Sequence, residues 1–173
     1  MCMNHVTTRK YLGVFESLFL VRTIQPWFTN MLSRLTKTPK LHFVDSGLLS
    51  ALLDLSPERL RVDRKPLGAV LETFVLGEVL KLASWSDDHF EVSHFRDKDG
   101  NEVDIVIENR RGQVVGIEVK AAATVTAADF GGLRRLAQAC GERFALGLVL
   151  HDHGHTVPFG DRLFASPISA LWG

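Results

Sequence analysis

Length, composition and charge set the first limits on this protein. The chain has 173 residues, of which 46% are hydrophobic, enough for one core with a small appendage. Twenty Lys and Arg balance twenty Asp and Glu, so net charge does not argue for nucleic acid and leaves a local basic patch open. Two distant cysteines argue against a disulfide framework, and no apolar run reaches membrane-spanning length. We expect a soluble cytoplasmic protein without a secretory signal.

The first 55 residues predict a helix, a hairpin and a second short helix. Apolar residues recur at helical spacing over 6–21, and residues 21–25 read as extended. Residues 41–45, LHFVD, alternate like a strand and precede the short helical stretch GLLSALLDL. A polar, basic stretch, residues 30–40, lies between the two extended segments. This order is typical of the last part of a winged helix, so we predict a partial winged-helix-like segment over residues 1–55.

The remainder of the chain predicts an alternating domain behind a linker. Residues 56–66 are polar with prolines near both ends and are expected to be the linker. Residues 67–173 then follow the order α, β, β, β, α, β. The expected elements are a helix over 67–82, strands over 90–95, 102–108 and 113–121, a helix over 126–139 and a strand over 144–150. The last strand is apolar throughout, which suggests burial on both of its faces.

The hairpin of the second and third strands places charges on a shared face. Side chains alternate along a strand, so Val103, Ile105 and Ile107 are expected to meet the core while Asp104 faces away from it. In the next strand Glu118 and Lys120 stand opposite the core set.

The turn of this hairpin determines how close the acids come. With the turn centred near Arg110 and Arg111, Asp104 pairs close to Gly116 or Ile117, and Glu118 is a diagonal neighbour roughly 7–8 Å away. A hard cation with bonds of about 2 Å can bridge such a pair of carboxylates. Two acids and a lysine around a metal suit phosphodiester hydrolysis. The alternative interpretation is an ordinary solvated outer face.

The helix over 67–82 is apolar on nearly all sides, yet it contains Glu72 and Glu78. A glutamate in an apolar sector needs a partner. Either residue could pair with a core cation or meet a metal at the sheet, and periodicity does not choose between them.

These residues carry a resemblance to a known superfamily. Glu72 in G-x-x-x-E on the first helix, Asp104 in EVD and Glu118-Val119-Lys120 in EVK resemble the PD-(D/E)XK nuclease superfamily, which includes restriction enzymes and archaeal Holliday-junction resolvases. More narrowly, the chain resembles the C-terminal domain of unknown function found on many prokaryotic AAA-type ATPases. The stretches that carry this second resemblance are YLGVFESLFLVRTIQPW, PKLHFVDSGLL, LGAVLETFVLGEV, FRDKDGNEVDIVIE, GIEVKA and PFGDRLFASPISALW.

The resemblance implies a fold and a site. The fold would be α/β (α+β), a restriction-endonuclease-like αβββαβ core with a mixed sheet. Asp104 and Glu118 would be metal ligands, with the Val119 carbonyl as a third. Lys120 would position or activate water, and Glu72 would complete the shell directly or through water. The ion would be Mg²⁺ (or Mn²⁺), and the substrate would be DNA.

The same resemblance raises the question of an ATPase module. The parent proteins carry one upstream, whereas no G-x-x-x-x-G-K-[ST] occurs here, so ATP hydrolysis is not expected from this chain. We expect a truncated gene, an expressed fragment or a stand-alone relative. Two other functions stay open: a catalytically inactive DNA-binding or regulatory module, and a homo-oligomerisation module that assembles ATPase subunits.

Two further groups of residues are candidates for binding. Arg34, Lys37 and Lys40 could meet phosphates from the tip of a wing, and Arg110 and Arg111 could contact a DNA backbone beside the metal site. For both groups a solvated basic loop is the alternative. Three histidines at alternate positions could bind zinc, but a polar loop is the preferred interpretation. They are His151, His153 and His155.

Overall fold

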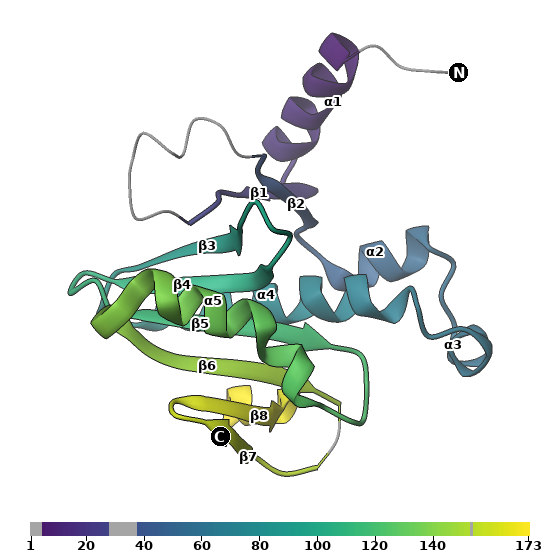
Figure 1. The fold of residues 1–173 in the computed structure, drawn as a ribbon. Helices are drawn as coiled ribbons and strands as arrows, with labels where there is room; N and C mark the ends of the chain where they lie inside the picture. The colour runs from purple at the N-terminus through teal and green to yellow at the C-terminus, as the bar shows by residue number, and fades with distance from the viewer. Residues whose placement is uncertain (1–4, 28–37, 153) are drawn as a thin grey trace.

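A computed structural model describes residues 5–27, 38–152 and 154–173, and its main body is a six-stranded sheet (Figure 1). The strand order is β3-β4-β5-β6-β8-β7. The strands are β3 Phe90–Arg96, β4 Glu102–Asn109, β5 Val114–Lys120, β6 Phe144–His151, β7 Val157–Gly160 and β8 Leu163–Pro167. β5, β6 and β8 are parallel, whereas β3, β4 and β7 each pair antiparallel. The predicted α/β (α+β) class with a mixed sheet is confirmed.

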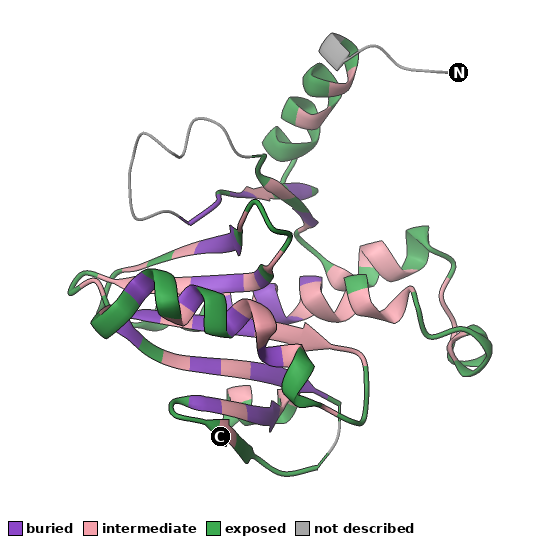
Figure 2. Cartoon of the chain, viewed as in Figure 1, coloured by how far each residue is buried: buried purple, intermediate pink, exposed green. Residues whose placement is uncertain are grey.

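Helices cover both faces of this sheet. α4, Leu67–Trp85, packs on one face through Val75, Leu76 and Val79. The other face carries the 3-10 helix η2, Ala127–Phe130, and α5, Gly131–Cys140. Figure 2 shows buried strand residues between the two layers. The expected order αβββαβ is confirmed. The alternative interpretation of an ordinary solvated outer face does not hold, because residues from both faces of the hairpin pack in the two core clusters.

A change of register in β4 overturns one predicted face. Phe95 pairs with Val103 but Ser93 pairs with Val106, so β4 contains an additional residue between these pairs, as in a β-bulge. Val103 therefore packs in the α5-side cluster, whereas Ile105 packs in the α4-side cluster. The prediction that Val103, Ile105 and Ile107 share one face is wrong for Val103.

The N-terminal elements follow the expected order of helix, hairpin and short helix. They are α1 His5–Ser17, β1 Val21–Ile24, β2 Lys40–Phe43 and α2 Ser46–Leu52. β1 and β2 form an antiparallel pair, with Ile24 opposite Lys40. α1 projects away from the main sheet (Figure 1). In the part of the chain that the structure describes, no helix combines the length and apolarity that a membrane span requires.

The predicted linker contains a short helix, and the segments on either side of it share cores. α3, Pro57–Val62, begins after Ser56, whose hydroxyl accepts from the backbone N–H of Arg59. Proline suits the first turn of a helix because the N–H it lacks would be unpaired there anyway. Ile24 lies in the α4-side core and Trp27 in the α5-side core. The division at 55 and 67 stays a prediction.

Two hydrogen bonds attach the N-terminal segment to the edge of the sheet. The backbone N–H of Trp27 donates to the His94 carbonyl at 2.6 Å, and the His94 N–H donates to the Gln25 carbonyl at 3.0 Å. His94 belongs to β3, the edge strand, so this segment covers part of an otherwise open edge. The hairpin of β1 and β2 is thereby held close to β4.

Candidate active site

The candidate site lies where β4 and β5 stop pairing. Their paired residues run from Glu108 and Val114 to Ile105 and Ile117, so the next residues in the same register are Asp104 and Glu118. The sequence placed Asp104 beside Gly116 or Ile117, and this prediction is wrong by one to two residues. The reason is that the turn is centred on Arg111.

Asp104 is held by two donors from different parts of the chain. Its Oδ2 accepts from the backbone N–H of Val119 at 3.0 Å, which ties the start of β4 to the end of β5. Its Oδ1 accepts from the ammonium of Lys40 at 2.9 Å. Val119, expected to offer its carbonyl to a metal, thus uses its N–H to position the Asp104 carboxylate.

Glu118 lies next to Asp104 and is incompletely neutralised. Its Oε1 is 3.0 Å from the Lys120 ammonium. Its Oε2 is buried and has no hydrogen-bond partner among the described residues. Burial and the nearby Asp104 raise the pKa of Glu118 to about 7, and Lys120 offsets this only in part. A buried acid in this state marks a position where further positive charge would be favourable.

Lys120 remains a cation at neutral pH. Burial alone would lower the pKa of Lys120, but Glu118 and Asp129 hold it above its ordinary value. Asp129 belongs to η2, where it forms a capping box with Thr126. The Lys120 ammonium can therefore attract an anion or orient a water molecule, but it has no lone pair with which to accept a proton.

The structure chooses between the two glutamates of α4. Glu72 reaches the site, because its Oε1 contacts the Lys40 ammonium. Burial and Asp104 raise the pKa of Glu72, and Lys40 offsets this in part. Glu78 instead pairs with Lys81 and accepts from the indole N–H of Trp172 at 3.3 Å. Negative charge at the site therefore comes from Glu72, Asp104 and Glu118.

Lys40 and His42 enter the site from β2. Burial alone would lower the pKa of Lys40, but Asp104 and Glu72 raise it above its ordinary value. His42 Nε2 lies 3.5 Å from Glu72 Oε1, and burial and Lys40 lower the pKa of His42 to about 4. The sequence assigned Lys40 to a DNA-binding wing and missed His42. Their spacing of two on a strand was the available signal, since it places both on one face.

The other predicted nucleic-acid contacts are not brought to this site. Arg34 and Lys37 lie outside the described residues. Arg110 and Arg111 form the turn at the opposite end of the β4–β5 hairpin, about 20 Å along the strand from Asp104. The expectation that these arginines flank the metal site is therefore wrong, because the acids are at the open end of the hairpin.

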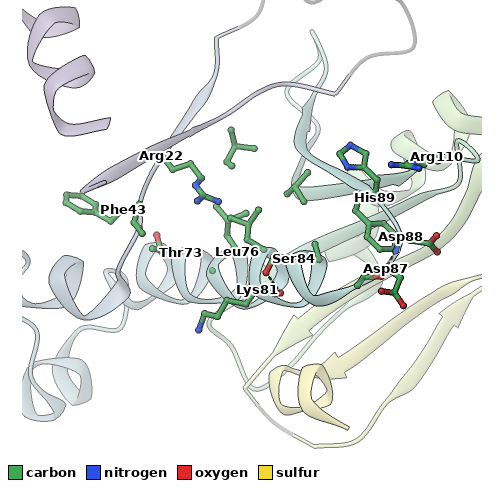
Figure 3. Close-up of a pocket in the computed structure, with 18 residues that line it drawn as sticks. Arg22, Phe43, Thr73, Leu76, Lys81, Ser84, Asp87, Asp88, His89 and Arg110 are labelled. Carbon is green, nitrogen blue, oxygen red and sulfur yellow. Dashed lines mark hydrogen bonds between the residues drawn. The ribbon is translucent and has the colours of Figure 1, made fainter. Parts of the chain in front are cut away.

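A separate cavity lies away from the acid cluster, and Asp104 and Glu118 do not line it. Its volume is about 890 Å³, and it is bounded by α4, the β1–β2 hairpin and β3. Figure 3 shows Arg22 and Arg110 at opposite ends of it. We place the candidate site at the acid cluster because the charges converge there.

The carboxylates of the site have the donor type that a hard divalent ion prefers. Three carboxylates with an unpartnered buried oxygen on Glu118 provide the oxygen donors that Mg²⁺ and Mn²⁺ prefer. Among the described residues, no group of three or more His, Cys, Asp or Glu side chains is placed so that it could hold a metal ion. The Lys40 ammonium occupies the space between Glu72 and Asp104. The oxygen donors are of the type that such an ion prefers, and the Lys40 ammonium lies between two of the three acids.

The histidines of residues 151–155 do not form a site in the described part of the chain. His151 ends β6 and is buried, His155 is exposed, and His153 lies outside the described residues. The predicted polar loop is therefore wrong for His151, which belongs to β6.

Comparison with known protein families assigns most of the chain to one family. Residues 67–171 match a family described as Domain of unknown function (DUF4143). The chain belongs to this family. The DUF4143 match contains the six-stranded sheet and the residues Glu72, Asp104, Glu118 and Lys120. Residues 2–59, which include Lys40 and His42, match a second model, Domain of unknown function (DUF8612). The expectation of a domain of unknown function is confirmed.

Two curated relatives match the DUF4143 chain. They are the uncharacterized proteins Rv2008c of Mycobacterium tuberculosis and Mb2031c of Mycobacterium bovis, each 29% identical over 167 residues. The matched region covers 95% of this chain and 35% of each relative. The chain therefore spans about a third of the length of these relatives.

Proposed function

We propose that this chain contains a PD-(D/E)XK-like module that hydrolyses DNA phosphodiesters with Mg²⁺ or Mn²⁺. The observation that carries the proposal is the convergence of Glu72, Asp104, Glu118 and Lys120 from α4, β4 and β5. The raised pKa of Glu118 supports it, because burial and then Asp104 disfavour the ionised carboxylate, which further positive charge would stabilise. The resemblance of the motifs supports DNA as the substrate and a cytoplasmic AAA-type ATPase as the context.

The residues have separate roles in this proposal. Asp104, Glu118 and Glu72 would hold the ion, which when bound would stabilise charge on the phosphate as a Lewis acid. Lys120 contributes a fixed positive charge that attracts the phosphate and orients the attacking water. Because Lys120 stays protonated, it acts by electrostatics and not as a general base. The Val119 N–H keeps the Asp104 carboxylate at the open end of the hairpin.

A second candidate function has its own supporting observation. The single positive charge of Lys40 contacts both Glu72 and Asp104, so the charges at the site are partly compensated within the chain. A module that kept this arrangement and lost catalysis would bind DNA or regulate an ATPase. It would bind DNA equally well in EDTA and after Lys120→Ala.

A nuclease assay tests the main proposal. Plasmid DNA, single-stranded DNA and RNA are incubated with Mg²⁺ or Mn²⁺ and with wild type, Asp104→Asn or Lys120→Met. We expect metal-dependent DNA cleavage, reduced at least about 100-fold by either substitution because each removes charge from the reacting site. Asp161→Asn is the matched control, since Asp161 is exposed and pairs only locally with Arg162 in the described structure. Equal cleavage by wild type and Asp104→Asn would reject the assignment, and no cleavage with either metal would favour the second function.

A further inference from the structure

We propose that Lys40 is a built-in counter-ion of the acid cluster, and that a divalent ion binds fully only after the Lys40 ammonium has left. The inference rests on the proposed function, because it concerns the ion that Glu72 and Asp104 would hold. It adds a residue from outside the DUF4143 match to the regulation of the site.

The position of the ammonium carries the inference. Lys40 Nζ lies 2.9 Å from Asp104 Oδ1 and contacts Glu72 Oε1, so it connects a strand acid with a helix acid. The acid side chains are only 12% and 19% exposed, and that of Lys40 is 29% exposed. An ammonium and a hard metal ion seek the same carboxylate oxygens. Both cannot occupy the space between these two acids.

The backbone of Lys40 is fixed, so the side chain is the part that can move. Lys40 pairs with Ile24 across the β1–β2 hairpin, and Ile24 is buried against α4. Two residues further, Pro26 bridges to His94 on β3, and the Trp27 indole donates to Glu108 Oε2 at 2.7 Å. The four-carbon stem of lysine, by contrast, rotates freely enough to move its charge by several ångströms.

A cavity beside the site offers the ammonium an alternative position. Its volume is about 370 Å³, and its lining includes Thr38, Pro39 and Lys40 itself. Asp97 and Glu102 also line it, and these carboxylates already pair with Arg135 and Arg96, so the released ammonium would share acids that other cations contact. Rotation of the Lys40 side chain into this cavity would therefore move its charge away from Glu72 and Asp104 without displacement of the hairpin.

The exchange predicts that Lys40 lowers the affinity of the site for metal. With Lys40 in place, one positive charge already offsets part of the negative charge of two of the three acids. Removal of its charge raises the net negative charge of the donor set, and ligand charge count strongly affects the affinity of such sites. The full chain with an uncharged residue at position 40 should then bind Mn²⁺ more tightly than wild type.

Calorimetric titration with MnCl₂ tests this on the full chain. We expect Lys40→Met and Lys40→Gln to bind Mn²⁺ about tenfold or more tightly than wild type. We also expect both to melt at a lower temperature in EDTA and to gain more from added Mn²⁺. The matched control is Lys81→Met, because Lys81 also pairs with a glutamate of α4. Asp104→Asn in the Lys40→Met background should abolish the gain. Circular dichroism establishes folding for each variant.

The outcomes separate this inference from the nuclease proposal. Unchanged Mn²⁺ affinity in both folded Lys40 variants overturns the inference, whether binding is tight or absent. So does an equal gain for Lys81→Met, or a gain that survives Asp104→Asn. Tighter Mn²⁺ binding without DNA cleavage by any variant supports the role of Lys40 and rejects the nuclease. Cleavage by wild type, together with unchanged Mn²⁺ affinity in the Lys40 variants, supports the nuclease and rejects the role of Lys40.

Discussion

At the scale of single residues, the site is a small group of charges that do not balance. Glu118 shows the imbalance most clearly, because one of its oxygens is buried without a hydrogen-bond partner in the described structure. Its pKa lies near 7 because burial and Asp104 together outweigh Lys120. Such a group destabilises the folded chain when it is ionised, and it favours any cation that can approach it.

The stability of the chain should therefore depend on pH through Glu118. Its unfolded pKa is near 4.5 and its folded pKa is about 7, so the folded state loses stability as pH rises through this window. We expect Glu118→Gln to be about 1 kcal/mol or more stable than wild type at pH 8 in EDTA, and the advantage to vanish near pH 4.5. Urea unfolding at several pH values measures this, with exposed Glu142→Gln as the control. A gain independent of pH would contradict the assignment of this titration to Glu118.

At the scale of elements, the close packing of α5 on β4 positions the start of the strand that carries Asp104. A Cβ on Gly132 would overlap the carbonyl oxygen of Glu102 and lie 2.8 Å from its carbonyl carbon. The backbone of a strand cannot retreat as a flexible side chain can. Gly132 thus permits a short distance between α5 and β4 that any other residue would enlarge. The strand residue at this contact, Glu102, lies only two residues before Asp104.

Neighbouring glycines in α5 provide a matched test of this contact. We expect Gly132→Ala to lower the free energy of unfolding by about 3 kcal/mol, because helix and strand must separate. Gly131→Ala should be neutral or stabilising by up to about 1 kcal/mol, because its Cβ meets no atom within 4 Å and alanine favours helix. Urea unfolding of both variants is the measurement. If the two substitutions had the same effect, the close approach would not be the cause.

At the scale of the whole molecule, the N-terminal hairpin and the six-stranded sheet are joined through Trp27. Its indole N–H donates to Glu108, the Arg143 guanidinium lies 5.7 Å above its ring, and the ring packs against Phe95. Arg143 also reaches Glu108 at 3.1 Å. Trp27 thus contacts one end of β4 at Glu108, and Lys40 contacts the other end at Asp104, which makes the candidate site a product of both segments.

Removal of the Trp27 contacts should lower the stability of the whole chain, which we expect to unfold in a single transition. We expect Trp27→Ala to cost about 3–5 kcal/mol through the cavity it leaves. Trp27→Phe should cost about 1–2 kcal/mol, because it removes the hydrogen bond to Glu108 and keeps most of the packing. Trp85→Ala is the control, since Trp85 is 76% exposed and should change stability by less than about 0.5 kcal/mol. Two unfolding transitions, with only one affected by Trp27→Ala, would instead show independent domains.

The sequence by itself determined the order of the elements and the chemistry at the end of the hairpin. Periodicity and turn residues are local properties, so they predicted α4, the three strands, α5 and β6 with small errors at their ends. Alternation along β5 placed Glu118 and Lys120 on one face, and the motifs added Asp104 and Glu72.

Only the tertiary structure decided which residues complete the site. Alternation on β2 predicts that Lys40 and His42 share a face, but it contains no information on what that face meets. Lys40 lies 64 residues from Asp104, and their contact depends on how the hairpin docks against the sheet. Periodicity likewise does not separate Glu72 from Glu78; the motif resemblance named Glu72, and packing brings it to Lys40. Docking is determined by the buried surfaces of several elements together, and for that reason local pattern could not predict it.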